Sequence, residues 1–143
     1  MKKLSLLLFV FILASCQHVK QEELAKLNGY WEIKQVTLSN GENKEYKVNE
    51  TIDFFALRQA QPDNKMEGFR QKVMPQFDGS YKTNGIKESI KIIEKEGDFF
   101  IDYKTQYSRW QEQIVAIEDS TLMLKNKNNL TYIYKRFRPF SLK

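Results

Sequence analysis

The chain has little of the side-chain chemistry on which metal sites and most enzymes depend. Its 143 residues include only 1 cysteine and 1 histidine. This count excludes a disulfide framework and a zinc site built from cysteine and histidine, and it argues against a nucleophile activated by histidine. We therefore expect no catalytic residues, no metal ion and no cofactor.

The chain also lacks a block of charge of one sign. Its formal net charge is +5, but acidic and basic residues alternate, as in Glu42-Asn43-Lys44-Glu45. A protein that binds nucleic acid is expected to carry a clustered basic footprint. We therefore expect no nucleic-acid partner and interpret these charges as a solvated surface.

The one long hydrophobic run lies at the N-terminus and is short. Lys2 and Lys3 precede the run from Leu4 to Leu13, which is followed by the small residues Ala14 and Ser15. This run suits the core of a signal peptide and falls short of the ~18 residues that suggest a membrane span. The sequence therefore predicts a lipoprotein signal peptide over residues 1–15.

The only cysteine follows this segment directly. Residues 13–16, Leu-Ala-Ser-Cys, resemble a bacterial lipobox, at which signal peptidase cuts and the cysteine thiol receives a diacylglyceryl group. Each buried CH₂ contributes roughly 0.8 kcal/mol to membrane binding, so several acyl chains would anchor the protein. We expect lipid attachment at Cys16, a polar tether over residues 16–27, and a location in the cell envelope. The outer membrane is favoured, and the face of the membrane stays open.

From Gly29 onward, apolar and polar residues alternate with period two, and turn-forming residues separate the segments. This pattern predicts antiparallel strands joined by hairpins, because the connections are too short for a crossover helix. We expect strands at residues 29–38, 46–57, 69–74, 76–83, 89–94, 99–105, 109–117, 121–126 and 130–137. The polar stretch 58–67 is expected to be a mobile loop or a lid, and Pro75 is expected to mark a bulge, a break or an edge.

This many short strands predicts an all-β fold, either a sandwich or an antiparallel up-and-down barrel of eight or nine strands. Closure removes exposed edges and favours the barrel. We assign residues 28–138 to the barrel domain and residues 139–143 to a C-terminal tail. The interior of an eight-stranded barrel is either filled by side chains or holds one small ligand, and both alternatives stay open here.

Large apolar residues of one parity on each strand are the candidates to line that interior. A shift of one residue in the register would turn the whole set to the outside. We expect the ligand-binding residues to be Phe54, Phe69, Phe77, Phe99, Ile101, Trp110 and Tyr132.

Two motifs resemble the lipocalin family. Gly29-Tyr30-Trp31 is similar to its Gly-x-Trp signature, and Arg136 stands in the last expected strand, where lipocalins commonly carry an arginine. Together with residues 68–81 and 122–126, these motifs make residues 27–137 similar to the lipocalin-like lipoproteins of Bacteroidota. The resemblance implies that Arg136 stacks on Trp31 at the closed end of the barrel, with Gly29 beside them, as a structural clasp.

Two functions follow as hypotheses. The first is a lipid-anchored envelope protein that binds, without catalysis, a small hydrophobic or amphipathic molecule inside the barrel. The alternative is a protein-interaction module with a filled barrel core. Its contact surfaces would be residues 58–67 and the basic and aromatic segment 135–140.

Overall fold

The computed structural model describes residues 18–47, 49 and 51–139. These residues form a short 3-10 helix and ten strands, joined by turns and loops. They are η1 (Gln21–Leu27), β1 (Gly29–Thr37), β2 (Asn43–Glu45), β3 (Ile52–Ala60), β4 (Lys65–Pro75), β5 (Tyr81–Thr83), β6 (Glu88–Lys95), β7 (Asp98–Lys104), β8 (Arg109–Ile117), β9 (Thr121–Asn126) and β10 (Thr131–Arg136). The expected signal peptide, Cys16 and the last residues of the tail lie outside the described residues. No helix within the described part of the chain is long and apolar enough to cross a membrane.

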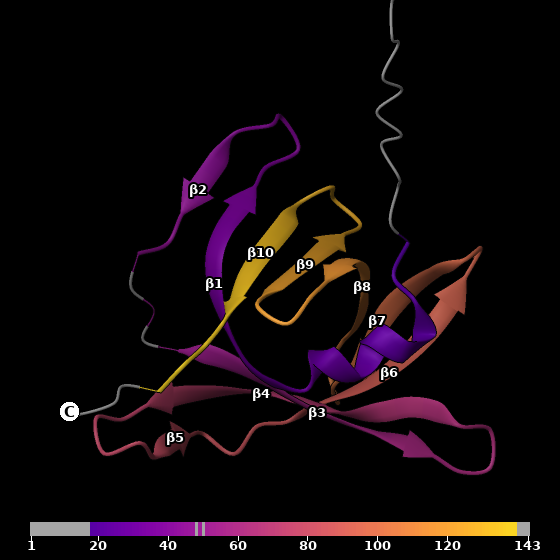
Figure 1. Cartoon of the computed structure of the whole chain (residues 1–143), viewed down its shortest axis with the longest axis horizontal. Coiled ribbons are helices and arrows are strands. Elements are labelled where there is room, and N and C mark those ends of the chain that lie inside the picture. Colours follow the sequence, from indigo (N-terminus) through magenta and orange to yellow (C-terminus); the bar gives the residue numbers. More distant parts are fainter. Residues whose placement is uncertain (1–17, 48, 50, 140–143) are drawn as a thin grey trace, which may run out of the picture.

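Eight of the strands close into a barrel. The order β1-β3-β4-β6-β7-β8-β9-β10 is antiparallel throughout, and β10 pairs again with β1 (Figure 1). β2 adds to β1 and β5 adds to β4 as extra strands. The expected fold class, an all-β, antiparallel up-and-down barrel, is confirmed, with eight strands in the barrel.

β1 is shared unequally between its two neighbours in the barrel wall. It pairs with β10 along most of its length, from Trp31 opposite Arg136 to Thr37 opposite Thr131, with an irregularity after Ile33. It pairs with β3 at only three positions, because its second half turns away and pairs with β2 instead. The side chain of Asn49 spans part of this separation by donating to the Ile33 carbonyl oxygen, 2.8 Å away.

Two expectations about the first half of the barrel were wrong. Residues 46–57 are not one strand, because β2 ends at Glu45 and β3 begins at Ile52. Residues 58–67 are not a loop but the end of the β3–β4 hairpin, in which Arg58 pairs with Glu67 and Ala60 with Lys65. Backbone hydrogen bonds stabilise this hairpin. Because such bonds do not require apolar residues, the polar sequence of residues 58–67 does not indicate a loop.

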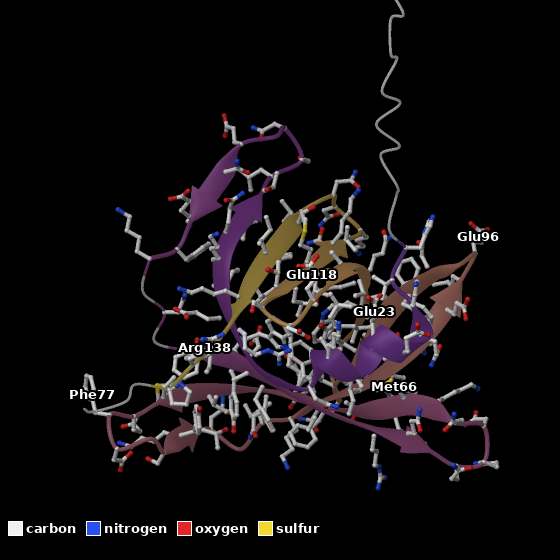
Figure 2. The ribbon with its side chains drawn as sticks, viewed as in Figure 1. Glu23, Met66, Phe77, Glu96, Glu118 and Arg138 are labelled. Carbon is white, nitrogen blue, oxygen red and sulfur yellow. The ribbon has the colours of Figure 1, made fainter. Side chains whose placement is uncertain are left out.

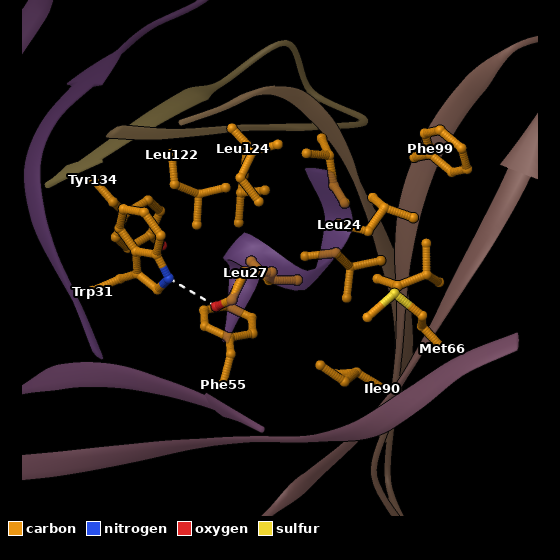
Figure 3. Packing of buried hydrophobic residues seen from close by; sticks show 14 of the residues in the cluster. Leu24, Leu27, Trp31, Phe55, Met66, Ile90, Phe99, Leu122, Leu124 and Tyr134 are labelled. Atoms are coloured by element: carbon orange, nitrogen blue, oxygen red, sulfur yellow. Dashed lines mark hydrogen bonds between the residues drawn. The ribbon is translucent and has the colours of Figure 1, made fainter. Parts of the chain in front are cut away.

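Helix η1 fills one end of the barrel. Leu24 and Leu27 are 1% and 0% exposed, and Trp31 donates from its indole Nε1 to the Leu27 carbonyl oxygen at 2.8 Å (Figure 3). Ile114, Leu122 and the other buried residues of the cluster surround these side chains. The core therefore extends from the helix into the barrel, and we call this end the closed end.

Candidate functional site: the distal half of the barrel

Away from η1, the inner wall of the barrel carries charged as well as apolar side chains. Cross-strand partners there bring aromatic and charged side chains together: Arg70 pairs with Glu88, and Tyr103 with Trp110. They share the parity of core residues such as Ile90 and Ile114, so they face inward. We call the following inner-wall residues the distal cluster: Arg70, Glu88, Tyr103, Trp110, Glu112 and Tyr132.

Aromatic surface dominates this cluster. The rings of Tyr103 and Trp110 stack with centroids 5.0 Å apart and an interplanar angle of 8°. The guanidinium of Arg70 lies over the Tyr103 ring, with Cζ 4.4 Å from its centroid, in a cation–π contact. Tyr103 is fully buried, whereas Trp110 and Tyr132 are only partly buried. The distal half therefore presents aromatic surface that is incompletely covered by the protein itself.

Arg70 connects the aromatic rings to two carboxylates. Its Nε donates to Glu88, and its Nη1 lies 3.8 Å from Glu112 Oε1. Burial raises the pKa of Glu112 above its ordinary value, although Tyr103 and Arg70 oppose this effect. A carboxyl group in this environment gains a proton more readily than one in water.

Tyr103 supplies a second polar group to the cluster. Burial raises the pKa of its phenol well above 10, so the hydroxyl keeps its proton. The hydroxyl lies beside Glu112, yet no described group makes a hydrogen bond of good geometry with it. Tyr103 is 0% exposed, so its hydroxyl is packed beside Glu112 rather than presented to a ligand.

The residues that the lipocalin resemblance selects lie together at the closed end. The Arg136 guanidinium covers the Trp31 ring, with Cζ 3.9 Å from the ring centroid. The same group donates to the carbonyl oxygens of Asn28, Lys26 and Asp119 at 2.6, 2.8 and 2.9 Å. Gly29 has φ of +115°, and a Cβ atom there would lie 2.8 Å from Arg136 Nη1. This clasp shares no residue with the distal cluster.

The expected ligand-binding residues divide between the two faces of the wall. Phe99 and Ile101 are buried in the core and face inward. Trp110 and Tyr132 also face inward, in the distal cluster. The structure thus brings Trp110 to Arg70, with Cζ 6.0 Å from the ring centroid.

Three of the expected residues do not face the interior, and this corrects the expectation. Phe55, 1% exposed, points inward in place of Phe54, and Arg70 points inward in place of Phe69. Phe77 is 78% exposed in the turn between β4 and β5, at the edge of the molecule (Figure 2). The parity of β3 and β4 is the opposite of that expected, because β4 buries a charged residue.

Sequence reasoning missed four members of the distal cluster: Arg70, Glu88, Tyr103 and Glu112. Tyr103 has the same parity as Phe99 and Ile101, so the alternation of β7 could have predicted it. Arg70 and Glu112 gave no such signal, because a charge in a strand is normally assigned to the solvent face. Among the described residues, no group of three histidine, cysteine or carboxylate side chains is arranged to hold a metal ion.

No family model and no curated protein matches the chain. Among solved structures, a lipocalin-like protein from Bacteroides uniformis is similar, with a TM-score of 0.49 and 13% sequence identity. The match covers 78% of this chain and 99% of the other.

Proposed function

We propose that this protein binds a small amphipathic molecule, without catalysis, in the distal half of its barrel. The observation that carries the proposal is the contrast between the two halves of the interior. The closed end is filled by Leu24 and Leu27, whereas the distal end has partly exposed Trp110 and Tyr132, with the buried Arg70 beside Trp110. Small-molecule sites characteristically combine apolar walls with a few polar groups that fix the orientation of the ligand.

The distal cluster supports an amphipathic ligand rather than a purely apolar one. Trp110 and Tyr132 supply partly exposed aromatic surface, while Arg70 and Glu112 supply polar groups in the same half of the barrel. Arg70 stays charged beside them and is balanced by Glu88 and Glu112. A ligand with an apolar body and one hydrogen-bonding group uses both kinds of surface.

We further propose that the protein acts from the cell envelope, anchored by acyl chains at Cys16, with the outer membrane as its location. The order of basic residues, hydrophobic run, small residues and cysteine supports this proposal. Metabolic labelling with an alkyne-tagged fatty acid tests it directly. We expect label on the wild-type protein and none on Cys16→Ser, and label on both forms would contradict the assignment of this residue.

Native mass spectrometry tests ligand binding. The protein is purified after exposure to an extract of bacterial envelope lipids, and its mass is measured under gentle conditions. We expect a stoichiometric adduct that Trp110→Ala abolishes. Tyr107→Ala is the matched control, because Tyr107 is an aromatic residue that is 89% exposed in the adjacent β7–β8 turn. An adduct-free mass in every preparation would instead favour the interaction module.

A further inference from the structure

A second hollow lies on the outside of the barrel, across β3, β4 and β6. Its volume is about 640 Å³, within the range of roughly 300–1,000 Å³ that small-molecule sites occupy. Phe69 lies at its centre and pairs with Ala56 on one side and Ser89 on the other. Because the neighbouring Arg70 faces the interior, these three residues face outward. We define the outer groove by Ala56, Arg58, Glu67, Phe69, Lys87 and Lys91.

Aromatic rings continue from the groove along the outside of the barrel. Phe69 meets Phe54 edge-on, with centroids 6.0 Å apart, and Phe54 stacks on Tyr30 at 4.6 Å. Tyr30 stacks in turn on Tyr81 at 4.3 Å. These four rings are all partly buried rather than covered. An apolar chain longer than the groove itself therefore has further surface along which to lie.

The groove also carries unbalanced positive charge. Arg58, Lys87 and Lys91 line it with a single carboxylate, Glu67. None of the three cations lies within 4.0 Å of a carboxylate in the described part of the chain, whereas Lys65 and other lysines do form such pairs. Lys87 instead holds its Nζ 4.2 Å from the centroid of the Phe69 ring. The groove thus offers an apolar floor beside cations that form no ion pair within 4.0 Å, with Glu67 and Asp102 opposite Lys91 in the sheet.

We propose that the outer groove binds an anionic amphiphile. The acidic group of this molecule is placed between Lys87, Lys91 and Arg58, and its apolar portion lies on Phe69 and the row of rings beyond. Three cations against one carboxylate favour an anion over a neutral or cationic ligand. The hollow accommodates one small molecule, and this site lies on the opposite face of the wall from the distal cluster. It is therefore independent of the function proposed for the interior.

Photo-crosslinking tests this site on the purified protein in the presence of phosphatidylcholine vesicles. The probe is a short alkyl diazirine carboxylate, and its methyl ester is the uncharged control. Peptide mapping by mass spectrometry locates the label. We expect the carboxylate to label residues 56–69 and 87–91 at least threefold more than the ester does, because surface charge pairs contribute a few tenths to 1 kcal/mol each.

Variants then test whether the cations direct the labelling. In the double variant Lys87→Gln and Lys91→Gln we expect the labelling of these segments to fall by roughly three- to tenfold. The control is Lys34→Gln, because Lys34 is an exposed lysine of β1 outside the groove, and it should label like the wild type. Equal labelling by carboxylate and ester, or no loss in the double variant, would overturn the proposal. Label found only around Trp110 would also overturn it, and would leave the interior site intact.

Discussion

The guanidinium of Arg136 lies over the indole of Trp31, 3.9 Å from the ring centroid, and so joins the last strand of the barrel to the first. The same guanidinium donates to the carbonyl oxygens of Lys26 and Asn28, which precede β1, and to that of Asp119, which precedes β9. A lysine would keep the charge but lose this fork of donors. The contact therefore stabilises the closed end of the barrel and is not part of the proposed binding site.

Replacing this arginine should therefore destabilise the barrel. We expect Arg136→Lys to lower the free energy of unfolding by about 1–2 kcal/mol and Arg136→Ala by about 2–4 kcal/mol, given the values typical of charged hydrogen bonds and cation–π contacts. Urea denaturation measures both. Arg138→Ala is the control, since Arg138 is exposed after the end of β10, and it should change stability by less than about 0.5 kcal/mol. Equal effects at both positions would contradict the clasp.

Gly68 should tolerate no side chain. A Cβ atom at this position would lie 1.8 Å from the carbonyl oxygen of Ala56 in the paired strand, so the two backbones would have to separate. We expect Gly68→Ala to cost more than about 3 kcal/mol or to prevent folding. Gly79→Ala is the comparison, because Gly79 has φ of +83° but open space around it, and it should cost only about 1–2 kcal/mol. Similar losses of stability in the two variants would contradict the close approach of β3 and β4.

Glu112 should make the protein less stable as pH rises. Burial raises its folded-state pKa above the ordinary value of 4.5, with Asp53 and Glu88 adding to the shift and Tyr103 and Arg70 opposing it. A raised pKa contributes stability that is complete below 4.5 and is lost as pH rises through the folded-state pKa. Glu112→Gln should therefore be the more stable form above that pKa. Urea denaturation from pH 4 to pH 8 compares the two, and a difference that does not change with pH would contradict the assignment.

The carboxyl group of Asp102 should make the protein less stable as pH falls. Arg109 donates to it at 2.7 Å, and together with Gln111 lowers the pKa of this carboxyl below 3.8. The resulting stability is complete above 3.8 and is lost as pH falls through the folded-state pKa. Arg109→Gln should move the midpoint of acid unfolding to higher pH, whereas Lys34→Gln should leave it in place. An unmoved midpoint in Arg109→Gln would show that this pair does not stabilise the fold.

The hairpins of the barrel could be predicted from the sequence because their signals are local. Turn residues such as Gly97 and the alternation around Phe99 and Ile101 fix the hairpins and their inward faces. The inward face of β3 could not be fixed in this way, since Phe54 and Phe55 are adjacent and either can point inside. The choice depends on long-range pairing, in which Phe55 lies opposite Arg70.

The distal cluster was less predictable than the fold. A buried arginine is stable only when partners from other strands satisfy it, and here these are Glu88 on β6 and Glu112 on β8. No pattern within β4 shows that these partners exist. Trp110 and Tyr132 were predicted because large aromatic residues are apolar enough to follow the alternation of their strands.

The indole N–H signals of the two tryptophans test the central proposal most directly. Trp31 lies at the closed end, where its Nε1 donates to Leu27, and Trp110 lies in the distal cluster. The chain contains 2 tryptophans, so a nitrogen-15 correlation spectrum resolves one signal from each end of the barrel. On titration with the compound recovered from envelope lipids, the Trp110 signal should shift in saturable fashion while the Trp31 signal stays in place. If Trp110 does not shift while the compound binds, the ligand does not occupy the distal half of the barrel.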